Sequence, residues 1–242
     1  MMVDVAYAYP SYILFSLVVW LGLFLYRSDL RKEIVVMSVL SAPLGPLGDF
    51  FYRRDYYNLP ILNGDLWILQ SSLLGFFLGG VSAVLFAELF KRRYARRREL
   101  WKKPVHNWWF CGVLLLGIVV MTLGTFVFAI NSVYVSLTVM LFGGAWIVWH
   151  RHDLIPEAVG NGVLLAVFFF VFYAIWLFLF PGIFVTQWHL ENLSGIFFMG
   201  IPVEEFLFAF AWGFITGPAY EFVYDLRFCR IKRRRGSSQK SR

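Results

Sequence analysis

Long apolar runs, separated by clusters of charge, constrain this chain more than any other feature. A helix needs roughly 20 mainly apolar residues to cross about 30 Å of hydrocarbon. Such runs make up most of the sequence, in which 60% of the residues are hydrophobic and only 15% are charged. They predict an all-α membrane protein with about seven transmembrane helices, at 12–26, 34–51, 66–90, 108–130, 132–149, 159–180 and 195–224.

The first two predicted spans could be mistaken for a signal peptide and for a loop, but their flanking and internal residues favour membrane helices. No Lys or Arg precedes the first span and Arg27 follows it, which is typical of an uncleaved anchor rather than of a signal peptide. The second span contains Pro43 and Pro46, which a helix tolerates when it is buried among neighbouring membrane helices. Both segments are therefore predicted to stay in the membrane.

The positions of the basic residues predict the orientation of the chain, because Lys and Arg gather in the cytoplasmic loops of membrane proteins. All of the 22 Lys and Arg residues except Arg53 and Arg54 fall after the first, third and fifth predicted spans or in the carboxyl-terminal tail. This pattern predicts a multi-pass protein of the cell membrane, with its amino terminus outside and its carboxyl terminus in the cytoplasm. The net charge of +7 is expected to contact anionic lipid headgroups. Nucleic acid is not an expected partner, because the basic clusters lie beside membrane spans and outside any nucleic-acid-binding motif.

A weak internal repeat relates two of the predicted spans. Residues 70–79 align with residues 204–213 through shared Leu, Phe and Gly, with Gln70 placed on Glu204. The predicted topology gives two three-helix units the same orientation in the bilayer, as in a parallel repeat. The predicted organisation is a first repeat at 1–90, a basic cytoplasmic loop and linking helix at 91–131, a second repeat at 132–226, and a basic tail at 227–242.

Glu204 and Glu205 are the most unusual charged residues, because they fall inside a predicted span. They lie about nine residues into it, roughly 13 Å from its outer end at 1.5 Å per residue. A charged carboxylate in hydrocarbon costs at least a few kcal/mol, so acids at such positions are candidates for function. Two adjacent acids in an apolar medium do not both ionise readily, and a protonated acid can donate its proton to an apolar substrate. The alternative is a structural role, in which both acids hydrogen-bond to polar groups of neighbouring helices.

Aromatic residues and a proline surround this acidic pair. Phe208 and Trp212 follow Glu204 at helical spacing, and Phe210 lies between them in sequence. Pro202 removes a backbone donor and is expected to kink the helix at this point. The pattern predicts two carboxyl groups that flank an aromatic stripe.

The segment from Gly200 to Phe208 resembles the Pro-x-Glu-Glu-x-x-Phe motif of the lycopene cyclase domain family, which are flavin-independent, integral-membrane carotenoid cyclases. The resemblance extends loosely over most of the chain, to the fused form with three helices, one helix and three helices. Where the first unit of the family usually has its own acidic pair, this chain has Gln70, Ser71 and Ser72, so its first repeat is degenerate. Asp49 and Asp55 are the candidates to replace the missing acids.

The resemblance implies a redox-neutral, acid-catalysed cyclisation of a carotenoid or a related isoprenoid polyene, by a lycopene cyclase-type intramolecular lyase or isomerase. It implies no metal and no other cofactor. The expected partners are the isoprenoid substrate and membrane lipids, and the oligomeric state stays open. The alternative function is a protein that binds isoprenoids or lipids without reacting, or that couples transport to protons. The residues implied for the site are Glu204 and Glu205 as acid and base, with Pro202, Phe208, Phe210 and Trp212 against the substrate.

Overall fold

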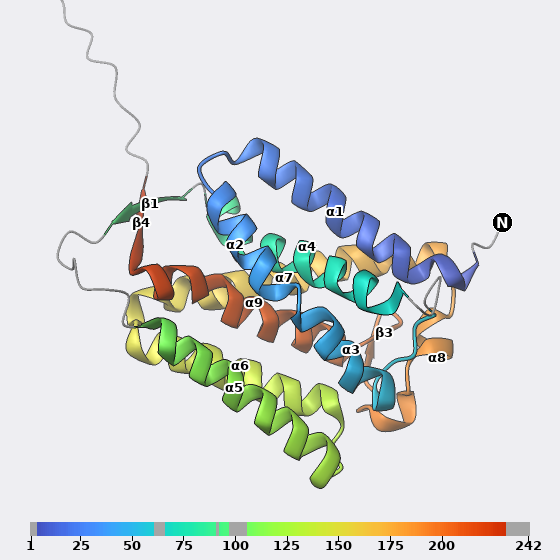
Figure 1. Ribbon diagram of the computed structural model, residues 1–242. Coiled ribbons are helices and arrows are strands. Elements are labelled where there is room, and N and C mark those ends of the chain that lie inside the picture. Colours follow the sequence, from blue (N-terminus) through green and yellow to red (C-terminus); the bar gives the residue numbers. More distant parts are fainter. Residues whose placement is uncertain (1–3, 61–65, 91, 97–105, 231–242) are drawn as a thin grey trace, which may run out of the picture.

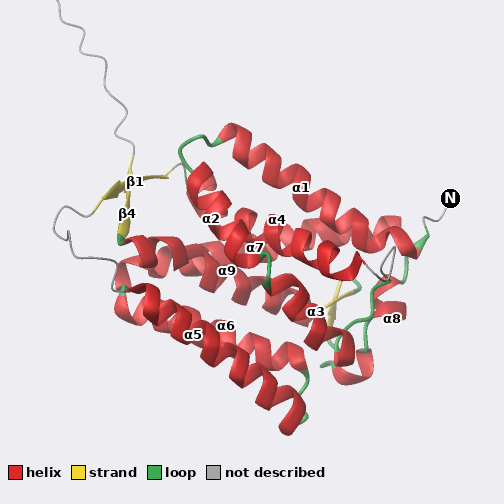
Figure 2. Ribbon diagram, in the orientation of Figure 1, coloured by secondary structure: helices red, strands yellow, loops and turns green. Residues whose placement is uncertain are grey.

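The computed structural model describes residues 4–60, 66–90, 92–96 and 106–230, and describes the side chains of all of these except 92–96, 106–110 and 227–230. Helices make up nearly all of the described chain, with short strands at the two ends of the bundle (Figure 2). The main helices are α1 (Ala8–Tyr26), α2 (Arg31–Ser41), α3 (Leu44–Asp55), α4 (Trp67–Leu89), α5 (His106–Thr122), α6 (Ser132–His150), α7 (Ile155–Leu179), α8 (Ile183–Gln187) and α9 (Val203–Tyr224). The strands are β1 (Arg92–Arg96), β2 (Phe197–Phe198), β3 (Ile201–Pro202) and β4 (Leu226–Arg230), and single helical turns occur at Val5–Tyr7, Leu123–Val127, His152–Leu154 and Leu190–Asn192.

The described part of the chain contains five helices that are long and apolar enough to cross a membrane. They are Val5–Tyr26, Trp67–Leu89, Ser132–His150, His152–Leu179 and Val203–Tyr224. A sixth span results if α2 and α3 are counted as one broken helix, and Cys111–Val127 is a shorter apolar helix. The prediction of an all-α, multi-pass membrane protein is thus confirmed, with five or six candidate spans among the described residues where seven were expected for the whole chain.

The second expected span, at 34–51, is not one helix. Helix α2 ends at Ser41, and α3 begins at Leu44 after a bend of 43°. Pro43 is the N-cap of α3, and its ring nitrogen has no hydrogen to continue the hydrogen-bond ladder of α2. Pro43 therefore lies at the break between two helices, whereas Pro46 is accommodated in the first turn of α3.

The last expected span, at 195–224, begins eight residues later than predicted. Residues 197–202 form the short antiparallel pair β2–β3, and helix α9 starts at Val203. Gly195 and Gly200 adopt positive φ angles of 72° and 83°, which turn the chain before the helix. Glu204 and Glu205 are therefore in the first turn of α9, not about nine residues inside it. Pro202 is the N-cap of this helix and does not kink it.

The helices form a bundle whose two ends differ. Helix α1 and the paired helices α5 and α6 lie at opposite edges, and α4, α7 and α9 pass between them (Figure 1). Strands β1 and β4 pair antiparallel at one end, and the amino terminus lies at the other (Figure 1). The segments at 91, 97–105 and 231–242, which carry much of the predicted basic loop and tail, lie outside the described residues, and the predicted repeat and its domain boundaries stay predictions.

The centre of the bundle is held by very close packing between α7 and α9, the most extensive helix contact. A Cβ atom on Gly213 would lie 2.7 Å from the backbone oxygen of Asn161 and 2.9 Å from the Cα of Gly162. The buried side chain of Asn161 donates to the backbone oxygens of Gly213 (2.9 Å) in α9 and Ser82 (2.6 Å) in α4, and accepts from the backbone N–H of Phe86 (3.3 Å). One amide group thus links three helices.

The outer faces of the bundle are apolar, as expected for a surface that meets lipid. Phe178 of α7 has 85% of its surface exposed, and Leu14 and Val18 of α1 are also mostly exposed. A monomeric soluble protein rarely exposes apolar surface on this scale.

We predict that Gly213→Ala lowers the stability of the bundle by about 1–3 kcal/mol, because the new methyl group forces α7 and α9 apart. The measurement is the midpoint of thermal unfolding of the detergent-solubilised protein. Gly22→Ala is the matched control, since nothing lies within 4 Å of a Cβ at Gly22. Equal unfolding midpoints for the two variants would contradict the packing described above.

Candidate functional site

A cavity of about 140 Å³ lies in the half of the bundle where α9 begins. Its wall comes from α1, α3, α4, α7 and α9, from the segment after α3, and from Trp188. Aromatic rings make up much of this wall, and two carboxyl groups, Asp49 and Glu205, interrupt it. Six tyrosines line the cavity: Tyr9, Tyr12, Tyr52, Tyr56, Tyr57 and Tyr173. An acid in such a cavity is largely shielded from water, which strengthens its interactions with nearby groups.

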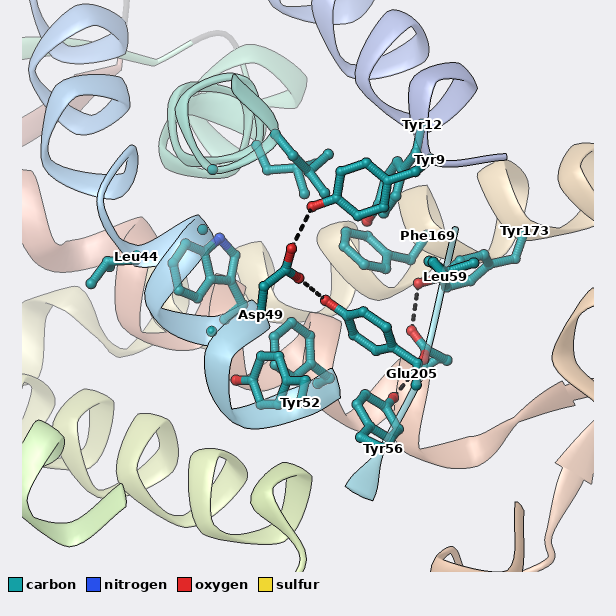
Figure 3. Close-up of a pocket in the computed structure, with 18 of the residues that line it drawn as sticks. Tyr9, Tyr12, Leu44, Asp49, Tyr52, Tyr56, Leu59, Phe169, Tyr173 and Glu205 are labelled. Carbon is teal, nitrogen blue, oxygen red and sulfur yellow. Dashed lines mark hydrogen bonds between the residues drawn. The ribbon is translucent and has the colours of Figure 1, made fainter. Parts of the chain in front are cut away.

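Glu205 is enclosed by three hydrogen-bond donors from other parts of the chain. Its Oε1 accepts from the Tyr56 hydroxyl and from the indole N–H of Trp188 at 2.7 Å, and its Oε2 accepts from the Tyr173 hydroxyl. Figure 3 shows the carboxyl group of Glu205 between the rings of Tyr56 and Tyr173. The side chain is almost fully buried, and these donors stabilise it there without a basic partner among the described residues.

Tyr56 lies just beyond the end of α3, and its hydroxyl donates to Glu205. Burial, together with the nearby Glu205 carboxyl, raises the pKa of the Tyr56 phenol well above its ordinary value. The phenol therefore keeps its proton near neutral pH and acts as a hydrogen-bond donor to Glu205.

Asp49 forms a second enclosed carboxyl group on α3. It accepts hydrogen bonds from the hydroxyls of Tyr9 (3.2 Å), Tyr57 and Ser71, and the Nε of Arg53 lies 3.6 Å from its Oδ2. Figure 3 shows Asp49 pointing toward Tyr9 across the cavity. The sequence placed Asp49 near the outer surface as a possible replacement acid, and the structure brings it to the wall that also contains Glu205.

Glu204 points away from this cavity. Its Oε1 accepts from the backbone N–H of Ser194 (2.7 Å) and from the Tyr134 hydroxyl (3.0 Å), and it is not among the residues that line the cavity. Successive residues of a helix are turned by about 100° from each other, so Glu204 and Glu205 meet different neighbours. The expected arrangement, with both carboxyls along one aromatic stripe, is therefore not found. Glu204 instead ties the loop before α9 to α6.

Of the expected substrate-binding residues, two line the cavity and two do not. Phe208 and Trp212, which follow Glu205 on α9, line the cavity. Phe210 stacks on Phe214 and packs against Gly162 of α7, and Pro202 is paired in the short β2–β3 ladder. Neither Phe210 nor Pro202 is among the described lining residues.

Asp55, His189 and Glu221 are three further polar residues whose contacts lie away from the cavity. Asp55 accepts from the backbone N–H of Ser132 at 3.0 Å and so anchors the start of α6. His189 contacts Glu191 on the surface, and Glu221 is buried in the last part of α9. None of these three lines the cavity.

Sequence reasoning missed the residues that enclose the two acids. Trp188, Tyr56, Tyr57 and Tyr173 were not among the residues predicted for the site. A usable signal was present, because Tyr52 and Tyr56 follow Asp49 near helical spacing and so recur on one face of the segment.

Comparison with known proteins bears on the second half of the chain. Residues 131–223 match the family described as Lycopene cyclase. The matched stretch contains α6, α7 and α9, and with them Glu204 and Glu205. It confirms the resemblance over this part of the chain, whereas Asp49 lies outside the match. The chain has no significant match among curated proteins or among solved structures.

We predict that Glu204→Ala loosens the loop at 190–202, because it leaves the Ser194 N–H and the Tyr134 hydroxyl without their acceptor. The loss of a buried acceptor costs about 1–3 kcal/mol. The expected result is faster limited proteolysis within this loop and a lower midpoint of thermal unfolding. Glu191→Ala, which changes a surface acid close by, serves as the control. Unchanged proteolysis of the Glu204→Ala variant would rule out this anchoring role.

Proposed function

We propose, from the premise that residues 131–223 form a lycopene cyclase family domain in a multi-pass membrane protein, that this protein closes a ring at the end of a linear isoprenoid polyene. The observation that carries the proposal is the Glu205 carboxyl, buried at the wall of an aromatic cavity and enclosed by three neutral donors. A carboxyl group held this way can transfer a proton to an apolar substrate that water does not reach.

The proposed reaction needs no oxidant and no reductant. A carboxylic acid adds its proton to a carbon of the terminal double bond, and the neighbouring carbon becomes a tertiary cation. A second double bond attacks this cation and closes the ring, and the positive charge moves to a ring carbon. Loss of a proton from an adjacent carbon then restores a double bond, so substrate and product are isomers.

The aromatic wall suits the charge that develops during this reaction. Tyr52 and Phe208 meet edge to face beside Glu205, and Phe169 and Trp176 line another part of the cavity. The faces of aromatic rings attract cations, by about 2 kcal/mol or more when both groups are shielded from water. Neutral rings also exclude nucleophiles that would trap the cation before ring closure.

A second cavity supports a long substrate. It has a volume of about 210 Å³ and shares Ser41, Leu44, Gly48, Tyr52 and Trp212 with the first cavity. Its other walls are mainly apolar residues of α2, α5, α6 and α9. In the proposed binding mode, the reacting end of the polyene occupies the first cavity and the adjoining chain enters the second.

The arrangement of charge supports the proposed orientation in the membrane. Arg27 binds Glu88 at 2.6 Å and Arg151 binds Asp225 at 2.8 Å, and both pairs lie at the end of the bundle where β1 meets β4. We place this end in the cytoplasm, because it carries Arg27, Arg151 and the basic residues of β1 and β4. The Glu205 cavity then lies in the outer half of the membrane.

We predict that Glu205→Gln lowers ring formation by at least about 100-fold, because an amide cannot donate the proton. The test is expression in lycopene-accumulating cells, with chromatography of the pigments and with the amount of folded protein measured in parallel. Glu191→Gln, a change at an exposed residue outside the cavity, should leave ring formation unchanged.

Ring-bearing carotenoids from the unmodified protein, and their loss in Glu205→Gln, would support the proposal. Lycopene that stays unchanged in the presence of well-folded unmodified protein would overturn it for this substrate. A protein that binds isoprenoids without reacting, or that couples transport to protons, would then be the better account of the buried acid.

A further inference from the structure

Asp49 is a buried carboxyl group that the proposed function has not yet used. It lies on the wall of the same cavity as Glu205, comes from the other half of the chain, and is 2% exposed. We propose that Asp49 is the second proton-transferring carboxyl group of the cavity, and that it removes the proton whose loss completes the ring. This inference rests on the proposed ring closure and identifies the base for it.

The surroundings of Asp49 and Glu205 differ, and this difference assigns the base to one and the acid to the other. Asp49 has a guanidinium neighbour, with Arg53 Nε at 3.6 Å, in addition to its three hydroxyl donors. Glu205 is enclosed only by neutral donors among the described residues. An adjacent cation stabilises a carboxylate, which is the form that accepts a proton. Asp49 is therefore suited to be the base, and Glu205 to be the acid.

The two halves of the chain repeat a motif at the start of their second helical segment. Arg27-Ser28-Asp29-Leu30 matches Arg151-His152-Asp153-Leu154. Each arginine binds the aspartate two residues later, at 2.9 Å in the first half and 2.8 Å in the second. Each arginine also binds an acid at the far end of its own half, Glu88 in the last turn of α4 and Asp225 directly after α9. The two halves thus repeat the same pair of arginine contacts.

Two alignments of the halves relate the carboxyl groups of the cavity. The arginine motifs are offset by 124 residues, and the same offset places Asp49 on Tyr173. The alignment of Gln70 with Glu204, offset by 134 residues, places Ser71 on Glu205. In the second half the Tyr173 hydroxyl donates to Glu205, and in the first half the Ser71 hydroxyl donates to Asp49. The same inter-helix contact thus occurs twice, with the acid on α9 in one half and on α3 in the other.

In the first half, the carboxyl group is on α3 and its hydroxyl partner is on α4, the reverse of the second half. The first repeat can therefore lack the acidic motif and still contribute a carboxyl group to the site. The hydroxyl of Ser71 occupies the place of an acid, and Asp49 supplies the carboxyl group from across the contact. During ring closure Glu205 loses a proton to the terminal double bond, and Asp49 gains one from a carbon next to the cation. After the product leaves, proton exchange returns both groups to their starting forms, so the cycle balances without a co-reactant.

The choice of base is visible in the product, because the carbon that loses its proton fixes the position of the ring double bond. We predict that Asp49→Asn lowers ring formation by about 100-fold and changes the proportions of double-bond isomers in the remaining product. Glu205→Gln should lower the total to a similar degree with unchanged proportions. Both are measured by chromatography of pigments from lycopene-accumulating cells, normalised to folded protein.

Asp55→Asn is the matched control, since Asp55 ends the same helix and anchors α6 but does not line the cavity. It should lower the midpoint of thermal unfolding without changing the isomer proportions. The double variant Asp49→Ser with Ser71→Asp exchanges the two partners and keeps their contact, so it should fold and recover part of the activity lost in Asp49→Asn.

Isomer proportions and yield that match the unmodified protein in a folded Asp49→Asn variant would overturn the inference. If Asp49→Asn does not fold, a folded double variant with no ring formation would overturn it as well. Failure of the unmodified protein to form rings would overturn the proposed function itself, and this result is distinct from the other two.

Discussion

The amide side chain of Asn161 is the contact on which the rest of the bundle depends. It lies at the closest approach of α7 and α9 and also binds two backbone groups of α4, where any of these polar groups left unpaired in the membrane interior would be costly. Ser71, Tyr173 and Glu205 belong to these same three helices. The geometry of the cavity therefore follows from a junction placed several turns away from it.

Phenol groups are well suited to enclose acids that change their charge. A hydroxyl can donate to a carboxylate and can accept from a carboxylic acid, so a tyrosine keeps its contact in both states. Tyr56 and Tyr173 around Glu205, and Tyr9 and Tyr57 around Asp49, give both acids this property. A lysine or arginine in direct contact with Glu205 would have bound the ionised form only. The composition of the cavity is thus consistent with repeated proton transfer in a medium of low polarity.

The sequence was sufficient to predict the elements that depend on local patterns of residues. Apolar runs predicted the long helices, and the cost of an acid in hydrocarbon pointed to Glu204 and Glu205, of which only Glu205 lines the cavity with Phe208 and Trp212. The start of α9 was misplaced, because apolar content alone does not reveal the turn that Gly195 and Gly200 make. The hydrogen-bond donors around Glu205 could not be predicted either, because Tyr56, Tyr173 and Trp188 come from distant segments that only tertiary packing brings together. The roles of Glu204 and Asp49 depend on which way each side chain points, which their spacing in the sequence does not determine.

Under the proposed function, the place of Glu205 in the first turn of α9 would also limit how a long substrate is processed. The carboxyl group lines the first cavity, and the second cavity adjoins this one through the residues that line both. A linear polyene bound in this way presents a single terminus to the acid, while its other terminus is directed elsewhere. For a molecule with two identical termini, modification of both requires that it leave and bind again in the reverse direction. A product altered at one end only would therefore be released as an intermediate, and the ratio of singly to doubly cyclised molecules would be set by its competition with fresh substrate.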